Sequence, residues 1–341
     1  MSPAESTFGL PFWLAVLLAV AAVLVVLALV NHLVARLAER RHPPEGALLD
    51  VDGVRLHYSD RGTGRPVVLL HGNAVTGADY NTSGVAERLI GRYRVVVFDR
   101  PGFGHSERPR GRAWTAAEQA DLIHAALARL GVSRPVVVGH SWGTLVALAF
   151  AERHPADTAG LVLLSGYYFP VPRLDSMLVA PAAWPVLGDV LRHTISPVFG
   201  WLTMPLVKRA MFAPAPMTER FRREYSTALA LRPSQLRATA SDGALMMSDA
   251  RALSARYGDL SMPVAIVAGS GDKVVGPDHA ERLRGAVPDG TVRLVEGAGH
   301  MVHHSATERV VEAIEEVVRR SDPAADRDPA SRPAAGAAGR A

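Results

Sequence analysis

The stretch PVVVGHSWGTLVALAFAERH, residues 135–154, decides the fold of this chain. It begins as a short apolar strand, passes through a turn with a glycine at each end, and continues as an apolar helix. The G-x-S-x-G pattern in this setting is typical of a sharp turn that exposes a nucleophilic serine. Gly139 and Gly143 remove side chains that would collide with neighbouring backbone. The pattern predicts Ser141 as a nucleophile; the alternative is a glycine-rich turn in which Ser141 only caps the helix.

Further apolar runs of strand length flank this stretch and alternate with helical segments. They are PVVLL from Pro66, RVVVFD from Arg94, GLVLLSG from Gly160, PVAIVAG from Pro263 and VRLVEG from Val292. Continuous apolar strands that alternate with helices indicate a parallel sheet covered on both faces. Ahead of them, LLDVDGVRLHYSDRG predicts an antiparallel hairpin that turns at Asp52 and Gly53. The expected fold class is therefore α/β.

A serine hydroxyl needs a base within hydrogen-bond reach and a carboxylate that orients this base. Of the 13 histidines, His300 is the best placed, because it lies in the loop directly after the last predicted strand. His303 and His304 begin the next helical segment and are expected to face solvent or to cap that segment. The other candidates belong to separate turns and loops: His71, His105 and His140.

The carboxylate candidate is Asp272, in the loop SGDKVV after the strand PVAIVAG. One helix and one strand separate Asp272 from His300. A right-handed crossover of that length brings both loops to the same edge of the sheet, facing Ser141. Asp249 and Asp259 are alternatives for this role, and a helix-capping role is the non-catalytic alternative for Asp272.

Acyl transfer also needs backbone N–H groups that hold the negative oxygen of the tetrahedral intermediate. In this type of turn one donor is the residue after the nucleophile, which is Trp142 here. The other comes from a loop after an earlier strand. The loop HGN at residues 71–73 follows PVVLL, so we expect the Asn73 backbone to be the second donor.

The motifs HGNAVTG, FDRPGFGHSERP, GHSWG, GDKVV and GAGH, in this order, resemble the α/β-hydrolase superfamily. The resemblance covers about Leu48 to Arg319 and weakens in the middle. It implies an α/β-hydrolase fold with an eight-stranded, mostly parallel sheet, a Ser-Asp-His triad and a helical cap that shapes the substrate pocket. No cofactor and no metal are expected.

Asn73 and Trp142 also resemble positions of haloalkane dehalogenases, whose Asn and Trp side chains hold the departing halide. Those enzymes and epoxide hydrolases use an aspartate nucleophile. Alkylation of Ser141 would give an ether that acyl-type hydrolysis cannot release. The sequence therefore argues against both activities and favours a role for the backbones of Asn73 and Trp142 alone.

An uncharged apolar run, LPFWLAVLLAVAAVLVVLALV, covers residues 10–30 after a short N-terminal tail, residues 1–9. About 20 apolar residues cross a bilayer, so this run predicts a single transmembrane helix. A cleaved signal peptide is the alternative, but no Lys or Arg precedes the run and no clear A-x-A site follows it. Three arginines follow the run within the juxtamembrane linker 31–46: Arg36, Arg40 and Arg41. They favour a cytoplasmic catalytic domain.

The remaining sequence divides into four parts. The hydrolase core is expected at 47–166 and 262–320, interrupted by a Pro-rich, apolar, helical insertion at 167–261 that we interpret as a cap. Residues 321–341 lack large apolar side chains and are predicted to be a disordered tail. The charge of +4 comes mainly from scattered arginines, so no nucleic-acid partner is expected. The chain has no cysteine, which excludes disulfides, thiolate nucleophiles and cysteine-ligated metals.

Together these features predict a membrane-anchored serine hydrolase that cleaves carboxylic esters of small hydrophobic molecules. Three alternatives remain open at this point. Two are enzymes of the same fold, a carbon–carbon bond hydrolase and a haloperoxidase-like perhydrolase. The third is a noncatalytic, membrane-tethered binding protein. The oligomeric state is not predicted.

Overall fold

The computed structural model describes residues 11–172 and 180–322 of the chain. The predicted N-terminal tail and nearly all of the predicted C-terminal tail lie outside these residues. An eight-stranded sheet in the order β1-β2-β4-β3-β5-β6-β7-β8 forms the centre of the molecule. Its strands are β1 (Ala47–Val51), β2 (Val54–Arg61), β3 (Pro66–Leu70), β4 (Arg94–Phe98), β5 (Val136–His140), β6 (Gly160–Leu164), β7 (Val264–Gly269) and β8 (Gly290–Val295).

The predicted mostly parallel sheet is confirmed. β1 and β2 form the antiparallel hairpin that turns at Asp52 and Gly53, and β2 pairs antiparallel with β4. All further pairings, from β4–β3 to β7–β8, are parallel. The carboxyl ends of these parallel strands therefore meet along one edge, where ligands of open α/β sheets bind.

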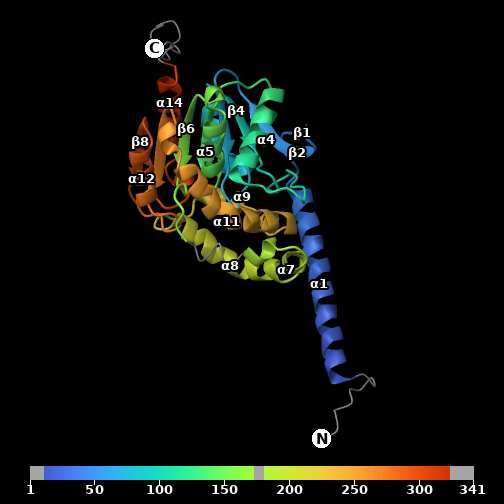
Figure 1. Ribbon diagram of the computed structural model, residues 1–341. Helices are drawn as coiled ribbons and strands as arrows, with labels where there is room; N and C mark the ends of the chain where they lie inside the picture. Colours follow the sequence, from blue (N-terminus) through green and yellow to red (C-terminus); the bar gives the residue numbers. More distant parts are fainter. Residues whose placement is uncertain (1–10, 173–179, 323–341) are drawn as a thin grey trace, which may run out of the picture.

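Helices cover both faces of the sheet (Figure 1). α3 (Val85–Ile90) and α14 (Thr307–Arg320) pack on one face, and α4 (Ala116–Arg129), α5 (Gly143–Arg153) and α12 (Asp278–Ala286) pack on the other. Side chains of strand β3 alternate between the two faces of the sheet. Val67 and Leu69 pack in the core with α3 and α14, and Val68 and Leu70 pack in the core with α4, α5 and α12. The short helices α2 (Ala78–Thr82) and α13 (Val302–Ser305) lie in loops at the strand ends.

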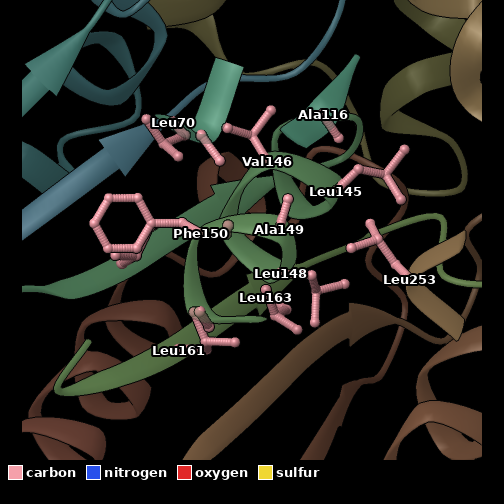
Figure 2. Packing of buried hydrophobic residues seen from close by; sticks show 14 of the residues in the cluster. Leu70, Ala116, Leu145, Val146, Leu148, Ala149, Phe150, Leu161, Leu163 and Leu253 are labelled. Atoms are coloured by element: carbon pink, nitrogen blue, oxygen red, sulfur yellow. The ribbon is translucent and has the colours of Figure 1, made fainter. Parts of the chain in front are cut away.

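Helix α5 lies in the middle of the larger core. Every residue from Gly143 to Ala151 is buried, which matches the absence of a polar stripe in this part of the sequence. Figure 2 shows Leu145 and Leu148 of α5 close to Leu163 of β6 and Leu253 of the insertion. The helix that follows Ser141 is thus fixed on all sides.

The chain between β6 and β7 forms a helical layer over the carboxyl edge of the sheet. It contains α7 (Leu187–His193), α8 (Ile195–Phe212), α9 (Glu219–Glu224), α10 (Thr227–Ala230) and α11 (Pro233–Ser254). Three short 3-10 turns complete the described helices: Pro155–Asp157, Ala180–Ala183 and Tyr257–Asp259. In Figure 1, α7 and α8 form the outermost part of this layer, near α1.

Helix α1 (Phe12–Arg41) is the one described helix that is long and apolar enough to cross a membrane, and none of its most apolar window is buried. A core helix of a soluble protein and a signal sequence can meet the same length and composition, but α1 is not a core helix because it is exposed. The helix continues 11 residues beyond Val30, through the juxtamembrane segment as far as Arg41. Contacts with the insertion explain this extension. Asn31 Nδ2 donates to His193 O and Thr194 O, both at 2.9 Å, and Glu39 pairs with Arg232 at 3.1 Å.

Candidate active site

The turn between β5 and α5 holds Ser141 in a conformation that L-residues rarely adopt. Ser141 has a φ of +51°, and its N–H donates to Leu164 O at 2.9 Å. A side chain at Gly139 would collide with the backbone of Gly143, and one at Gly143 would collide with Leu70 O and His71 O. The fixed packing of strand, helix and neighbouring loop maintains the backbone strain, which is a common property of functional turns.

The structure brings the three predicted triad residues together. Ser141 Oγ lies 2.9 Å from His300 Nε2, and His300 Nδ1 lies 2.8 Å from Asp272 Oδ2. His300 and Asp272 are buried. A carboxylate accepts hydrogen bonds and does not donate them, so Nδ1 carries the proton and Nε2 is left to accept one from Ser141.

Asp272 is held by its own loop. Its Oδ1 accepts hydrogen bonds from the N–H groups of Val274 and Val275, at 2.8 and 3.0 Å, which leaves Oδ2 directed at His300. The two alternative carboxylates lie elsewhere. Asp249 accepts from Ala116 N at the start of α4, and Asp259 pairs with Arg256.

The loop after β3 packs directly against the serine. A Cβ at Gly72 would lie 3.0 Å from Ser141 Cβ, so this loop approaches the nucleophile as closely as its backbone allows. His71 anchors the loop, because its Nδ1 donates to Gly72 O at 2.7 Å and its Nε2 accepts from Arg100 N at 2.9 Å. Burial lowers the pKa of His71 to about 4, which matches a neutral ring that uses one nitrogen as an acceptor. Trp142 directly follows Ser141, and Asn73 follows Gly72 in the loop that packs against the serine.

A family model for the alpha/beta hydrolase fold matches residues 65–307. The chain belongs to the α/β-hydrolase family. The match includes the serine turn, the loop after β3 and the loops of Asp272 and His300. The predicted family is therefore confirmed, and this protein is a hydrolase of that fold.

Relatives of this hydrolase carry out several kinds of reaction. Haloalkane dehalogenase 2 of Mycobacterium tuberculosis is 35% identical over 133 residues, 39% of this chain and 46% of the relative. The 2-hydroxymuconate semialdehyde hydrolase of Pseudomonas putida is 33% identical over 136 residues, 39% of this chain and 48% of the relative. This chain thus matches less than half the length of either relative. A thermophilic esterase from Thermogutta terrifontis has a similar structure, with a TM-score of 0.63 and 24% identity over 81% of this chain and 99% of the esterase.

The side chains of Asn73 and Trp142 are engaged within this hydrolase. The indole N–H of Trp142 donates to Asp242 O at 2.9 Å, and Asn73 Oδ1 accepts from Arg100 at 2.8 Å. The indole hydrogen is therefore used inside the protein and is not directed at a halide.

A buried ionic network that the sequence did not predict lies behind the serine turn. Arg100 follows β4 and is fully buried, and it donates to His71 O, Gly72 O and Asn73 Oδ1. Its guanidinium also pairs with Asp242 of α11 at 2.6 Å. Arg100 thereby ties the loop after β3 to the helical insertion. The position of FDRPGFG after a central strand was a signal for Arg100, but nothing local pointed to Asp242.

His303 and His304 are buried, so the expectation that they face solvent or cap a helix is wrong. Both donate to the carboxylate of Asp79 in α2, at 2.7 and 2.8 Å. Burial alone would raise the pKa of Asp79, but His304 and His303 hold it well below its usual value. A buried carboxylate attracts partners from distant parts of the chain because an unpaired charge is costly.

One group of side chains has the composition of a metal site. Ligand atoms of Asp79, His140 and His303 lie within 4.8 Å of one another, and all three residues are buried. His140 also links this cluster to the triad, since its Nε2 lies 3.2 Å from His300 O. Asp79 already receives two imidazole N–H groups, whereas the buried Nδ1 atoms of His140 and His303 have no hydrogen-bond partner among the described residues.

A cavity of about 570 Å³ lies between the loop after β3, strand β2 and helices α9 and α10. Ala74, Val75, Phe221 and Leu229 contribute its apolar wall. Ser141, Asp272 and His300 do not line it, so this cavity is separate from the triad.

Proposed function

We propose that this chain is a membrane-anchored serine hydrolase that cleaves carboxylic esters of hydrophobic substrates. The observation that carries the proposal is the continuous hydrogen-bond line from Ser141 Oγ through the His300 ring to Asp272, with steps of 2.9 and 2.8 Å. These are distances at which a proton can pass between heavy atoms.

In the first half of the reaction, His300 Nε2 takes the Ser141 proton while Oγ attacks the ester carbonyl carbon. Asp272 stabilises the imidazolium that forms. When the tetrahedral intermediate collapses, the bond to the alcohol breaks and His300 gives its proton to the departing oxygen. The acyl group remains on Ser141. Water then attacks the acyl-enzyme, with His300 as base, and releases the acid.

The negative oxygen of each intermediate requires fixed donors. We assign the N–H groups of Trp142 and Asn73 to this role. Trp142 is the cap of the 11-residue helix α5, whose N-terminal end carries partial positive charge. Asn73 is the residue after Gly72, which lies against Ser141. Removing one donor of this kind costs about 100- to 1000-fold in rate.

We propose that the insertion 167–261 serves as the cap over this site. Three contacts support this role: α11 reaches the loop after β3 through Asp242 and Arg100, Tyr225 donates to Ala74 O at 3.0 Å, and Gly299 packs against the end of α8. Beneath the insertion lies an apolar cluster that includes Val75, Phe212, Phe221 and Met301. This apolar packing beside the loop of His300 is our reason for proposing a hydrophobic acyl or alcohol group.

Hydrolysis of a carbon–carbon bond is the second candidate, because the P. putida relative is a 2-hydroxymuconate semialdehyde hydrolase. The same triad can serve that reaction. Parallel assays with p-nitrophenyl esters of increasing acyl length and with a dienoate ketone separate the two. Faster turnover of the ketone would replace the ester assignment, and a preference for short acyl chains would contradict the hydrophobic substrate.

A fluorophosphonate probe tests the nucleophile directly. The wild-type protein is expected to become labelled at Ser141, and Ser141→Ala to remain unlabelled. A Thr144→Ala variant is a matched control, since Thr144 Oγ1 donates to Ser141 O without joining the triad. Failure of the wild type to react, or equal reaction of Ser141→Ala, would support a noncatalytic protein of the same fold.

We propose that α1 stays attached as the membrane anchor. Its hydrogen bonds from Asn31 and its ion pair at Glu39 make the end of the helix part of the folded body, which supports retention over removal as a signal peptide. The basic residues Arg36, Arg40 and Arg41 after the apolar run support a cytoplasmic catalytic domain. Extraction of membranes with alkaline carbonate is expected to leave the full chain in the pellet. Release of the chain would contradict the anchor.

A further inference from the structure

Helix α8 presents apolar side chains outward instead of inward. Five of them follow one helical face, which we name the α8 stripe: Ile195, Val198, Phe199, Leu202 and Leu206. Phe199, Leu202 and Leu206 are 64%, 74% and 71% exposed, whereas Pro197 and Met204 on the opposite face are buried. The stripe has the spacing of an amphipathic helix with the exposed side apolar.

The surroundings of the stripe extend the same surface. Trp184 and Val186 before α7, Leu187 at the start of α7 and Trp201 beside the stripe are each about half exposed or more. The sequence ISPVFGWLTMPLV, residues 195–207, contains no charged residue. An apolar surface of this extent is typical of a contact with a partner or a membrane.

The position of α1 identifies the partner. Asn31 is the first polar residue after the apolar run of α1, and its side chain donates to His193 O and Thr194 O, where α7 ends and α8 begins. The segment from Phe12 to Val30 rises about 28 Å at 1.5 Å per residue, which is close to the thickness of a bilayer's hydrocarbon core. The start of α8 therefore lies at the depth where α1 leaves the hydrocarbon. In Figure 1, α8 runs across the direction of α1, on the side toward which α1 protrudes.

We propose that the α8 stripe docks into the lipid surface of the bilayer that α1 crosses, so that the cap lies in the membrane interface. This inference rests on the anchor proposed above. The chemistry agrees, because Trp184 and Trp201 are of the type that concentrates at bilayer interfaces. Arg209, exposed at the end of α8, is placed to meet lipid phosphates.

The docked helix also contacts the active site. Met301, next to His300, donates its N–H to Met211 O at 3.2 Å near the end of α8. A side chain at Gly299 would collide with Phe212 O. One helix of 18 residues thus connects the bilayer surface with the loop of the catalytic base. The substrate class that fits is an ester whose acyl chain lies in the bilayer and enters beneath the cap.

Site-directed spin labelling of the full chain in phospholipid vesicles tests the docking. The chain has no cysteine, so single labels can be placed by Leu202→Cys in the stripe, Leu18→Cys in α1 and Leu294→Cys on the distant strand β8. All three positions are exposed in the structure. We expect oxygen, which concentrates in lipid, to relax the labels at positions 202 and 18 more than a water-soluble nickel chelate does. The order is expected to be reversed at position 294.

The outcomes distinguish the two proposals. A label at position 202 that prefers nickel, while position 18 prefers oxygen, would overturn the docking and leave the anchor intact. Preference for nickel at both positions would overturn the anchor and the docking together. Spin–spin broadening at position 202, with neither reagent reaching it, would mean that a second copy of the chain covers the stripe, and this also overturns the lipid contact.

A second measurement uses turnover. The ratio of the rate on a vesicle-borne ester to the rate on a soluble ester is expected to fall at least about tenfold in the triple variant Phe199→Ser, Leu202→Ser, Leu206→Ser. The control Leu294→Ser removes an exposed leucine elsewhere and is expected to keep the wild-type ratio. An unchanged ratio in the triple variant would contradict the docking.

Discussion

Helices α5 and α8 have similarly apolar sequences and opposite environments. In α5 all residues from Gly143 to Ala151 are buried between the sheet, α4 and the insertion. In α8 only Pro197, Met204 and Phe212 are buried out of 18 residues. An apolar sequence therefore indicates a low-polarity environment, but not whether protein or lipid provides it. The position of α1 is what distinguishes the two cases here.

Truncation of a leucine is expected to have the largest effect on the free energy of unfolding. This cost is also expected to differ most between α5 and α8. Leu148→Ala in α5 removes a side chain that is 1% exposed and is expected to cost about 3–5 kcal/mol of unfolding free energy. Leu202→Ala in α8, at 74% exposure, is expected to cost less than about 0.5 kcal/mol. Urea unfolding in non-ionic detergent measures both. Equal costs would mean that protein covers α8 in the folded state.

Removal of a buried carboxylate tests how the stability of the folded state around α5 depends on pH. Burial raises the pKa of Asp249, on the helix α11 that packs against α5, to about 6 from 3.8. A raised carboxyl pKa means that the folded state holds the proton more tightly, so stability is full below pH 4 and declines as the pH rises through 6. This decline amounts to about 3 kcal/mol.

Asp249→Asn keeps an acceptor for Ala116 N–H and removes the charge. We expect the variant to be more stable than wild type by about 3 kcal/mol at pH 7.5 and equally stable at pH 4. Unfolding curves at the two pH values measure the difference. Glu296→Gln, at an exposed carboxylate, is the control and is expected to keep the wild-type stability at both pH values. A constant gain for Asp249→Asn at both pH values would contradict the linkage.

Two glycines provide a matched pair in the same helices. Gly143→Ala places a Cβ against the backbone of Leu70 and His71, whereas Gly200→Ala in α8 meets only the flexible side chain of Leu231. The first change is expected to cost about 1–3 kcal/mol and to lower turnover about 100-fold, because the serine turn must shift. The second is expected to change stability by less than about 1 kcal/mol. Loss of turnover in Gly200→Ala would show that α8 is as constrained as α5.

The smallest expected effect concerns the junction of α8 with α1. Asn31→Ala removes the two hydrogen bonds to His193 O and Thr194 O and is expected to cost about 1–2 kcal/mol. The conservative change Asn31→Gln provides a control with the same amide group. Spin labels in α1 and α8 report the distance distribution between the helices, which is expected to broaden in Asn31→Ala. An unchanged distribution would mean that other contacts set the angle between them.

The local parts of the site could be predicted from the sequence. Ser141, Asp272 and His300 each follow a parallel strand, and the carboxyl ends of such strands converge without any knowledge of side-chain packing. The positions of Asn73 and Trp142 can be predicted in the same way, because Asn73 lies in the loop after β3 and Trp142 directly follows Ser141. The repeated apolar runs and the hairpin predict the mostly parallel sheet, and the resemblance to the α/β-hydrolase superfamily implies its eight strands.

The parts that could not be predicted depend on distant partners. Arg100 and Asp242 are 142 positions apart, and Asp79 and His303 are 224 apart. The first pair exists only after the insertion has packed onto the sheet edge, and the second only after α2 and α13 have come together. For the same reason the burial of His303 and His304 could not be predicted, since no residue of their own helix indicates a buried carboxylate.

The collisions around Ser141 also bear on how such a chain can diverge. A Cβ would collide with Ser141 or with fixed backbone at three positions: Gly72, Gly139 and Gly143. Most substitutions there are therefore expected to abolish the reaction. The outward residues of α8 meet no such barrier. New substrates are therefore expected to arise through drift in the cap, while the serine turn stays nearly invariant among descendants.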